Sequence, residues 1–291
     1  MIPHFDFKKP VSIPELKECL NSFNNDSSII AGGTDVVPGF QQESSRFVNI
    51  KQLVDINNIP ELKEIKIVDN NLLIGAGVTF SDVCKNSLAK NKVPLLVKAA
   101  QTVGSLQIRN RATVAGNFVN NAPCADSVPP LLVYNASINI LSPNGFRLIP
   151  LQDFLIRPYK TQLLANECVT EIIIPLTDKN LKGDFYKLGR RSAVSISRIT
   201  LAVLMDVQNS IIKEFRVASG AITPIGKRFF EIEEKAVGKA ANSGTFMEIA
   251  ENMGESVLET TGLRWSTAYK LPVLQQMLYQ LIENINAKES E

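Results

Sequence analysis

Two polar segments of this 291-residue chain have the residue types that a large polar cofactor needs. The first, Ala31-Gly32-Gly33-Thr34-Asp35-Val36, follows the apolar pair Ile29-Ile30, as a glycine loop follows a strand. The second runs from Gln107 to Asp126 and concentrates Arg, Asn, Thr, Gly and Asp within an apolar neighbourhood. Burying such a segment costs free energy unless its polar groups find partners, and a polar cofactor provides them. Two such loops, far apart in sequence, fit a large dinucleotide.

The glycine loop has a specific phosphate-binding interpretation. Gly32 and Gly33 allow backbone N–H groups to approach a pyrophosphate with no Cβ in the way, and successive N–H groups form an anion nest. Taken alone, a Gly-Gly-Thr-Asp sequence more often forms an ordinary tight turn. The Rossmann and Walker glycine patterns are both absent from the sequence, so neither of those phosphate sites is available.

The second segment contains Thr113-Val-Ala-Gly-Asn117, which places a hydroxyl, a position without a side chain and an amide close together. Thr113 could donate to a phosphate, Gly116 could allow close approach, and Asn117 could bond a nucleotide or flavin edge. The alternative is a strand end closed by an asparagine. Asp126 could accept from ribose or ribityl hydroxyls, or could simply cap a helix.

A third cluster runs from Phe185 to Arg191 and is rich in basic residues. On a strand, Phe185, Lys187 and Gly189 share one face, so Lys187 could point into a pocket. A cation near the pyrimidine side of a flavin stabilises the anionic reduced form and raises its potential. A solvated basic strand edge is the alternative.

Cysteine and histidine usage excludes several kinds of chemistry. Cys19, Cys84, Cys124 and Cys168 form no CxxC pair, so we expect no iron–sulfur cluster held by this chain alone. His4 is the only histidine, and we expect it in a strand near the N-terminus. A single histidine in that position argues against Ser–His and Cys–His catalysis and against a histidine metal site.

Bulk composition is that of an ordinary globular protein, with 45% hydrophobic and 21% charged residues. The 31 basic and 29 acidic residues leave a formal net charge of +2, and the scattered bases argue against a nucleic-acid surface. No apolar run approaches the roughly 20 residues of a membrane span. The N-terminus lacks the basic and apolar parts of a signal peptide, so we expect a cytoplasmic protein and no membrane partner.

The elements that must position these residues follow from periodicity and turn signals. The predicted strands are residues 28–31, 64–68, 72–76, 112–115, 137–141, 146–149, 184–188, 200–209 and 211–221. The predicted helices begin at a Ser12–Glu15 capping box, at Thr79 (through Ala89), at Val93 (through Val103), at Asp126 or Ser127 (through Asn135), and at Ser266 (through Asn286). This order favours an α+β fold over regular βαβ alternation. The pattern loosens between Pro175 and Gly183, which predicts a domain boundary.

Taken together, these segments resemble the FAD-binding subunit of the molybdenum hydroxylases, the xanthine dehydrogenase family. The matching segments span essentially the whole chain in order: AGGTD at 31–35, QIRNRATVAGN at 107–117, APCAD at 122–126, FYKLGRR at 185–191 and RWSTAYK at 264–270. The resemblance is greatest to the separate medium subunits of bacterial xanthine dehydrogenases. Two departures are Ala115, where the family commonly has glycine, and Cys168, where a larger aliphatic residue is commoner.

The resemblance implies an α+β fold with an FAD-binding domain of the molybdopterin dehydrogenase type at residues 1–176. This domain would have two subdomains, at about 1–58 and 59–176. An α/β C-terminal domain of the carbon monoxide dehydrogenase flavoprotein type would follow at 177–291.

The resemblance also implies the FAD contacts. The glycine loop would wrap the pyrophosphate, the Thr113 segment would complete the phosphate and flavin contacts, and Asp126 would contact the sugar portion. Cys168 and Val169 would lie over the isoalloxazine, with Lys187 beside that ring. The complete predicted set is Ala31, Gly32, Gly33, Thr34, Asp35, Val36, Val103, Ile108, Thr113, Gly116, Asn117, Asp126, Cys168, Val169 and Lys187.

The implied function is electron transfer within a complex. One partner subunit would carry two [2Fe–2S] clusters, another would carry the molybdenum cofactor, and the FAD would pass hydride to NAD. We expect the FAD to be non-covalent, because His4 is the only histidine available for a histidyl link. Alternatives are the flavoprotein subunit of an aldehyde, nicotinate or carbon monoxide dehydrogenase, or a non-redox nucleotide-binding assembly protein. The substrate and the choice among NAD, O₂ and ferredoxin stay open.

Overall fold

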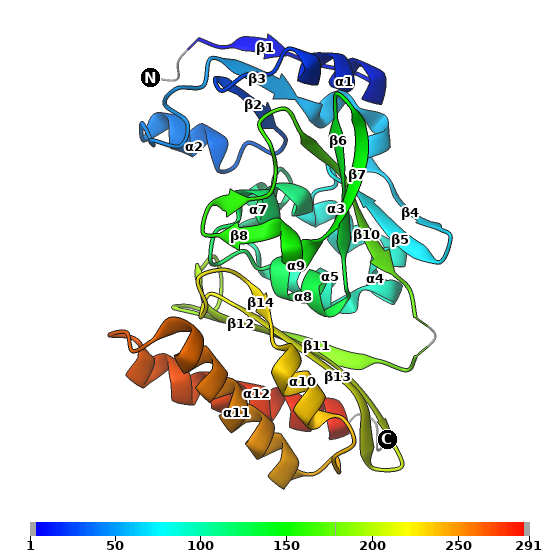
Figure 1. Cartoon of the computed structure of the whole chain (residues 1–291), viewed down its shortest axis with the longest axis vertical. Coiled ribbons are helices and arrows are strands. Elements are labelled where there is room, and N and C mark those ends of the chain that lie inside the picture. The colour runs from blue at the N-terminus through cyan, green and yellow to red at the C-terminus, as the bar shows by residue number, and fades with distance from the viewer. Residues whose placement is uncertain (1–3, 178, 288–291) are drawn as a thin grey trace.

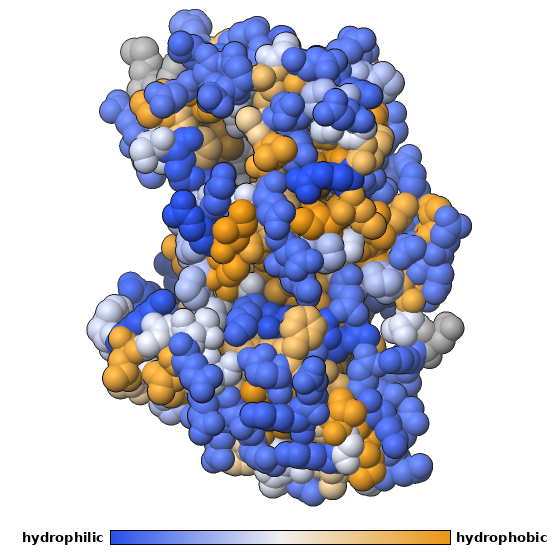
Figure 2. Space-filling model, in the orientation of Figure 1, coloured by the Kyte–Doolittle hydropathy of each residue, from blue (hydrophilic) through white to orange (hydrophobic). Residues whose placement is uncertain are grey.

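Three main sheets and their helices follow one another along the long axis of the molecule, in chain order from the N-terminal to the C-terminal end (Figure 1). The computed structural model describes residues 4–177 and 179–287. Within these residues no helix is long and apolar enough to cross a membrane. The face seen in Figure 2 is hydrophilic over most of its area, with hydrophobic residues gathered near the middle of the molecule.

The N-terminal layer is a parallel sheet of β1 (Asp6–Lys8), β3 (Gln52–Asp55) and β2 (Ser27–Ile30), with β3 in the centre. Helix α1 (Ile13–Asn21) buries Leu16 and Leu20 against it. The Ser12 hydroxyl accepts from the Glu15 N–H and caps this helix as predicted. The Glu15 carboxylate accepts from the N–H of Val11, the residue before Ser12. His4 lies before β1, so its predicted place in a strand is wrong.

The middle layer is an antiparallel sheet in the order β4-β5-β10-β6-β7. Its strands are β4 (Ile65–Val68), β5 (Asn71–Gly75), β10 (Cys168–Pro175), β6 (Ser137–Ser142) and β7 (Gly145–Pro150). The two predicted hairpins are confirmed as β4–β5 and β6–β7. Asp69, Asn70 and Gly145 turn them with positive φ, a conformation that these short polar residues and glycine tolerate.

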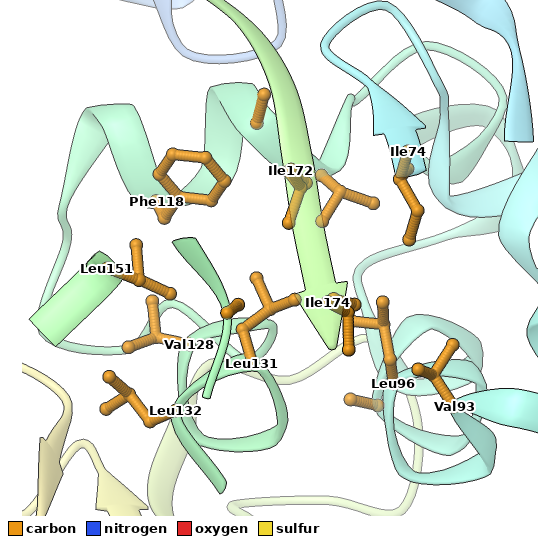
Figure 3. Close-up of a cluster of buried hydrophobic side chains, with 14 of the residues drawn as sticks. Ile74, Val93, Leu96, Phe118, Val128, Leu131, Leu132, Leu151, Ile172 and Ile174 are labelled. Carbon is orange, nitrogen blue, oxygen red and sulfur yellow. The ribbon is translucent and has the colours of Figure 1, made fainter. Parts of the chain in front are cut away.

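Helices cover one face of the middle sheet and form its core (Figure 3). They include α5 (Pro94–Thr102), α7 (Val114–Asn120) and α8 (Val128–Val133). Ile172 and Ile174 of β10 point toward these helices, and both side chains are buried. Burying one such aliphatic side chain contributes about 1.5–3 kcal/mol, so this core fixes the helices that approach the polar segments.

Two predicted elements differ from the structure. The predicted helix from Thr79 to Ala89 is two helices, α3 (Phe80–Lys85) and α4 (Ser87–Lys92), because the extended Asn86 ends one and caps the other. The predicted strand at 112–115 is wrong. Thr113 makes one isolated bridge to Thr79 and then caps α7, since its hydroxyl accepts from the N–H of Gly116 at 3.0 Å.

The C-terminal layer is an antiparallel sheet in the order β11-β12-β13-β14: β11 (Lys182–Gly189), β12 (Ser197–Gln208), β13 (Ile211–Gly220) and β14 (Lys227–Arg228). One face packs on α10 (Phe230–Ala236), α11 (Ser243–Thr261) and α12 (Thr267–Ala287), the other on α5 and α8 (Figure 1). Strands precede helices here instead of alternating with them, and the α+β class is confirmed. The division of the chain after residue 176 stays a prediction.

Candidate cofactor site

A cavity of about 370 Å³ lies where the N-terminal layer meets the middle layer. Its walls come from the loop after β2, the segment between α5 and α7, α7 itself and the start of β10. The volume falls within the range of small-molecule and cofactor sites, roughly 300–1,000 Å³. Segments far apart in sequence therefore form one site.

Thirteen of the fifteen predicted cofactor residues line this cavity. They are Ala31, Gly32, Gly33, Thr34, Asp35, Val36, Val103, Ile108, Thr113, Gly116, Asn117, Cys168 and Val169. Asp126 and Lys187 do not line it. The contacts of all fifteen with a cofactor stay predictions.

The two glycines of the first loop serve different purposes. Gly33 has φ +72°, a conformation that L-residues with side chains rarely adopt. A Cβ on Gly32 would lie 2.1 Å from the carbonyl oxygen of Arg111, so Gly32 allows the two polar segments to touch. The absence of a side chain at Gly32 is thus required by packing, which the sequence alone did not indicate.

The same loop presents unused hydrogen-bond donors. Within the described part of the chain, the backbone N–H groups from Gly32 to Val36 donate to no acceptor. Two of the loop carbonyls are occupied, because Gly33 accepts from Val37 and Asp35 accepts from Gly39. Consecutive free N–H groups form a concave donor set that suits a phosphate or pyrophosphate. This donor set fits the dinucleotide part of FAD.

Helix α7 contributes the second polar wall. The Thr113 oxygen accepts the cap bond of α7, which leaves its hydroxyl proton and one lone pair available for a ligand. The Asn117 Oδ1 accepts from the Ser127 hydroxyl at 2.7 Å and from the Ser127 N–H at 3.3 Å. This fixes the amide of Asn117, a residue that lines the cavity, and its Nδ2 donates to no acceptor within the described part of the chain. Gly116 is exposed there.

The remaining wall is apolar. Cys168 and Val169 at the start of β10 are buried, and Val103 and Phe80 add further apolar surface. Burial raises the pKa of the Cys168 thiol to about 12, so the thiol is neutral at physiological pH and lies against the cavity as an apolar group. An apolar surface of this kind fits a flavin ring.

Asp126 and Lys187 form a buried ion pair outside the cavity lining. Lys187 Nζ lies 2.6 Å from Asp126 Oδ2, and the two side chains are 9% and 7% exposed. The Ser197 hydroxyl also donates to Asp126, and Lys187 Nζ donates to the Thr102 carbonyl at 3.0 Å. Burial raises the pKa of Asp126, while Lys187 and Ser197 act in the opposite direction. Ser127, not Asp126, precedes α8, so Asp126 does not serve as a helix cap.

Sequence reasoning missed several residues of the cavity wall. Arg46, Phe47 and Asn120 line the cavity, as does Leu163. Arg46 follows the polar stretch Gln41–Ser45, which has neither a periodic pattern nor a turn motif, so no signal distinguished it. Asn120 is the last residue of α7. The sequence predicted a strand at 112–115 and no helix after it, so nothing singled out Asn120.

A second cavity of about 670 Å³ lies on the other side of the segment 101–109. Val103 and Ile108 of this segment face the first cavity, whereas Thr102, Ser105 and Arg109 face the second. Four basic residues and no acidic residue line this second cavity within the described ranges: Arg109, Lys187, Arg190 and Arg191. No group of three or more His, Cys, Asp or Glu residues in those ranges could hold a metal ion.

Comparisons with known proteins agree with this arrangement. Residues 3–177 match the family model of the FAD-binding domain in molybdopterin dehydrogenase, and residues 184–285 match the carbon monoxide dehydrogenase flavoprotein C-terminal domain. The chain is 32% identical over 282 residues to the xanthine dehydrogenase FAD-binding subunit of Escherichia coli O157:H7, covering 96% of each chain. It is 27% identical over 283 residues to the glyceraldehyde dehydrogenase medium chain of Sulfolobus acidocaldarius, covering 97% of this chain and 99% of that one.

Among solved structures, a chain of carbon monoxide dehydrogenase from Hydrogenophaga pseudoflava superposes with a TM-score of 0.90 at 26% identity, covering 99% of each chain. That enzyme lacks the Mo-pyranopterin moiety of its molybdenum cofactor. The two family matches together span nearly the whole chain, and the cavity lies within the residues that the first one covers. The chain therefore belongs to the FAD-binding medium subunits of the molybdenum hydroxylases, the xanthine dehydrogenase and carbon monoxide dehydrogenase family.

Proposed function

We propose that the first cavity holds one non-covalent FAD, and that the chain carries electrons from partner-subunit [2Fe–2S] clusters to NAD. The observation that carries the proposal is the pairing of free loop amides with an apolar wall in one cavity. A bound flavin can accept electrons singly and release two together as a hydride. In this proposal the substrate is oxidised at a molybdenum cofactor on another subunit.

The residues of this chain bind and orient the cofactor. The N–H groups from Gly32 to Val36 hold the pyrophosphate, and the Asn117 amide bonds a polar edge of the cofactor. Cys168 and Val169 exclude water from one side of the ring. Among the described side chains of the apolar wall, Cys168 is the ionisable one, and burial keeps its thiol neutral, so the wall supplies position and an apolar surface rather than proton transfer.

The basic cavity supports NAD as the electron acceptor. Arg109, Arg190 and Arg191 bring positive charge that suits the pyrophosphate of a dinucleotide, whereas Lys187 is paired with Asp126. The segment 101–109 contributes residues to both this cavity and the proposed flavin cavity. Arg190 is exposed, and its guanidinium makes no hydrogen bond or ion pair within the described chain. It is therefore available to a ligand.

The test adds NADH anaerobically to the FAD-loaded protein and follows loss of the oxidised flavin absorbance. Arg190→Gln should weaken NADH binding by roughly 10-fold, about the effect of losing one charge-assisted hydrogen bond, with unchanged flavin content. Lys213→Gln, at an exposed position on β13, is the matched control. Flavin that dithionite reduces but NADH does not would refute the NAD acceptor while leaving the FAD site intact.

A further inference from the structure

Arg46 is the only basic side chain among the described residues that line the first cavity, and Asp35 is the only acidic one. A pyrophosphate carries negative charge, and Arg46 is the one side chain among these lining residues whose positive charge can compensate it. None of the fifteen predicted cofactor residues supplies this charge inside the cavity, because Lys187 is paired outside it.

Arg46 is anchored on the N-terminal side of the cavity through its neighbour Phe47. The Phe47 ring packs against α2 (Val36–Gln41), where a Cβ on Gly39 would lie 2.3 Å from the ring. The same ring contacts Phe40 edge-on, with centroids 5.7 Å apart. This packing fixes the backbone from which Arg46 projects.

The Arg46 side chain spans to the opposite wall. Its Nη2 donates to the Asn120 side-chain oxygen at the end of α7. Its guanidinium carbon lies 4.5 Å from the centroid of the Tyr159 ring, in a cation–π contact. Arg46 therefore connects the N-terminal and middle layers across the edge of the cavity.

The opposite wall is itself held firmly. Asn121 adopts a left-handed conformation after α7 with φ 47°, and its Nδ2 donates to the carbonyls of Arg157 and Lys160 at 2.9 and 3.0 Å. The Asn121 carbonyl accepts from the N–H of Tyr159 at 2.9 Å. These bonds tie the turn between β8 (Leu155–Arg157) and β9 (Lys160–Thr161) to α7, so the two partners of Arg46 move as one unit.

The Arg46 charge is not neutralised by an ion pair. No carboxylate of a described residue lies within 4.0 Å of its guanidinium. The nearest acidic influence is Asp35, whose pKa is raised by loss of solvent and lowered by Arg46. A guanidinium has five N–H donors, and one bond to Asn120 leaves most of them available.

We propose that Arg46 is the cationic ligand of the FAD pyrophosphate, binding it opposite the free N–H groups of the loop 32–36. The proposal rests on the FAD site described above. It makes Arg46 a determinant of dinucleotide binding: Arg46 acts on the phosphate-bearing part of the cofactor and not on the isoalloxazine ring. Asn120 and Tyr159 are positioning residues that hold the guanidinium over the cavity.

The test measures dissociation constants of the full chain for FAD and for riboflavin by fluorescence titration at low and high salt. Arg46→Gln should weaken FAD binding by roughly 10- to 100-fold and reduce its salt dependence, leaving riboflavin binding within about 2-fold of the wild type. Arg46→Lys should recover part of the FAD affinity, since it keeps the charge without the planar donor fork. Arg157→Gln is the matched control, an exposed arginine on the same turn outside the cavity.

Asn120→Ala distinguishes the effect of the Arg46 charge from the effect of the Arg46–Asn120 hydrogen bond that joins the two walls. It removes this hydrogen bond and keeps the Arg46 guanidinium. The salt dependence of FAD binding should persist in Asn120→Ala and fall in Arg46→Gln. Wild-type FAD affinity in Arg46→Gln, or a decrease of salt dependence that Asn120→Ala reproduces, would overturn the assignment of Arg46. A wild-type chain that binds neither FAD nor riboflavin would instead refute the proposed FAD site.

Discussion

Removing the cation from the buried Lys187–Asp126 pair should destabilise the junction between the middle and C-terminal layers. Lys187→Met keeps most of the side-chain volume and deletes the charge, so the Ser197 hydroxyl is the one side-chain partner that Asp126 retains among the described residues. It also removes the bond to the Thr102 carbonyl at the end of α5. That end leads directly into Val103, which lines the cavity.

The expected loss of stability follows from the burial of the Lys187–Asp126 pair. Both side chains are less than a tenth exposed, and breaking a buried pair by removing one partner costs about 3–5 kcal/mol. For a protein of this size, each kcal/mol shifts the melting temperature by roughly 2–4 °C, so we expect a decrease of about 6–20 °C. Asp126→Asn keeps a hydrogen-bonding group but leaves Lys187 without its counter-ion, so it should also destabilise the protein.

The assay is thermal unfolding of Lys187→Met, Asp126→Asn and the double variant at several pH values. The double variant should be less destabilised than the sum of the single variants, because neither charge is left unpaired. In Lys187→Met the folded-state pKa of Asp126 rises further above its unfolded value, since burial already raises it and the opposing lysine is gone. The neutral carboxyl needs no counter-ion, so the deficit should shrink as pH falls through that pKa.

Strict additivity of the two single variants would refute the coupling between these groups. A Lys187→Met deficit that is constant with pH would equally refute it, because it would show that the loss comes from packing and not from charge. Flavin content, measured in parallel, reports whether the end of α5 positions Val103 for the cofactor.

Three further outcomes follow from the structure. Gly32→Ala should destabilise the protein by at least 1–3 kcal/mol and reduce flavin content, because its Cβ would meet the Arg111 carbonyl; wild-type melting would contradict the close packing. Thr113→Val should cost about 1 kcal/mol in denaturant unfolding, since the Gly116 N–H loses its cap, and an unchanged midpoint would show the cap to be dispensable. Burial raises the pKa of Glu167, but its arginine partner and a backbone N–H lower it below the ordinary value. The stability that wild type has over Glu167→Gln should therefore be present above the ordinary carboxyl pKa and be lost as pH falls through the lowered one; a pH-independent difference would contradict this.

The sequence predicted the parts of the fold that local patterns determine. The turn residues Asp69 and Asn70 and the Pro143-Asn-Gly145 turn identified both hairpins of the middle sheet. Alternation along β11 predicted that Phe185 and Lys187 share a face, and both side chains are buried while Tyr186 between them is 49% exposed. Local pattern and tertiary burial agree at these positions.

The errors arose where tertiary contacts outweigh local preference. The β-branched Thr113 and Val114 favoured a strand, but the hydroxyl of Thr113 caps a helix that the middle core buries. The partner of Lys187 lies 61 residues away in sequence, so no spacing rule identified Asp126. Arg46 stands in a segment without periodicity, and only the folded chain places it in the cavity.

The measurement that tests the central claim most directly is the flavin content of the purified full chain after incubation with FAD and desalting. The proposed site predicts close to one flavin per chain, released into solution by acid because no covalent bond holds it. A folded chain that retains no flavin and shows no change in FAD fluorescence on titration would contradict the assignment of the cavity. Flavin that stays with the acid-precipitated protein would contradict non-covalent binding.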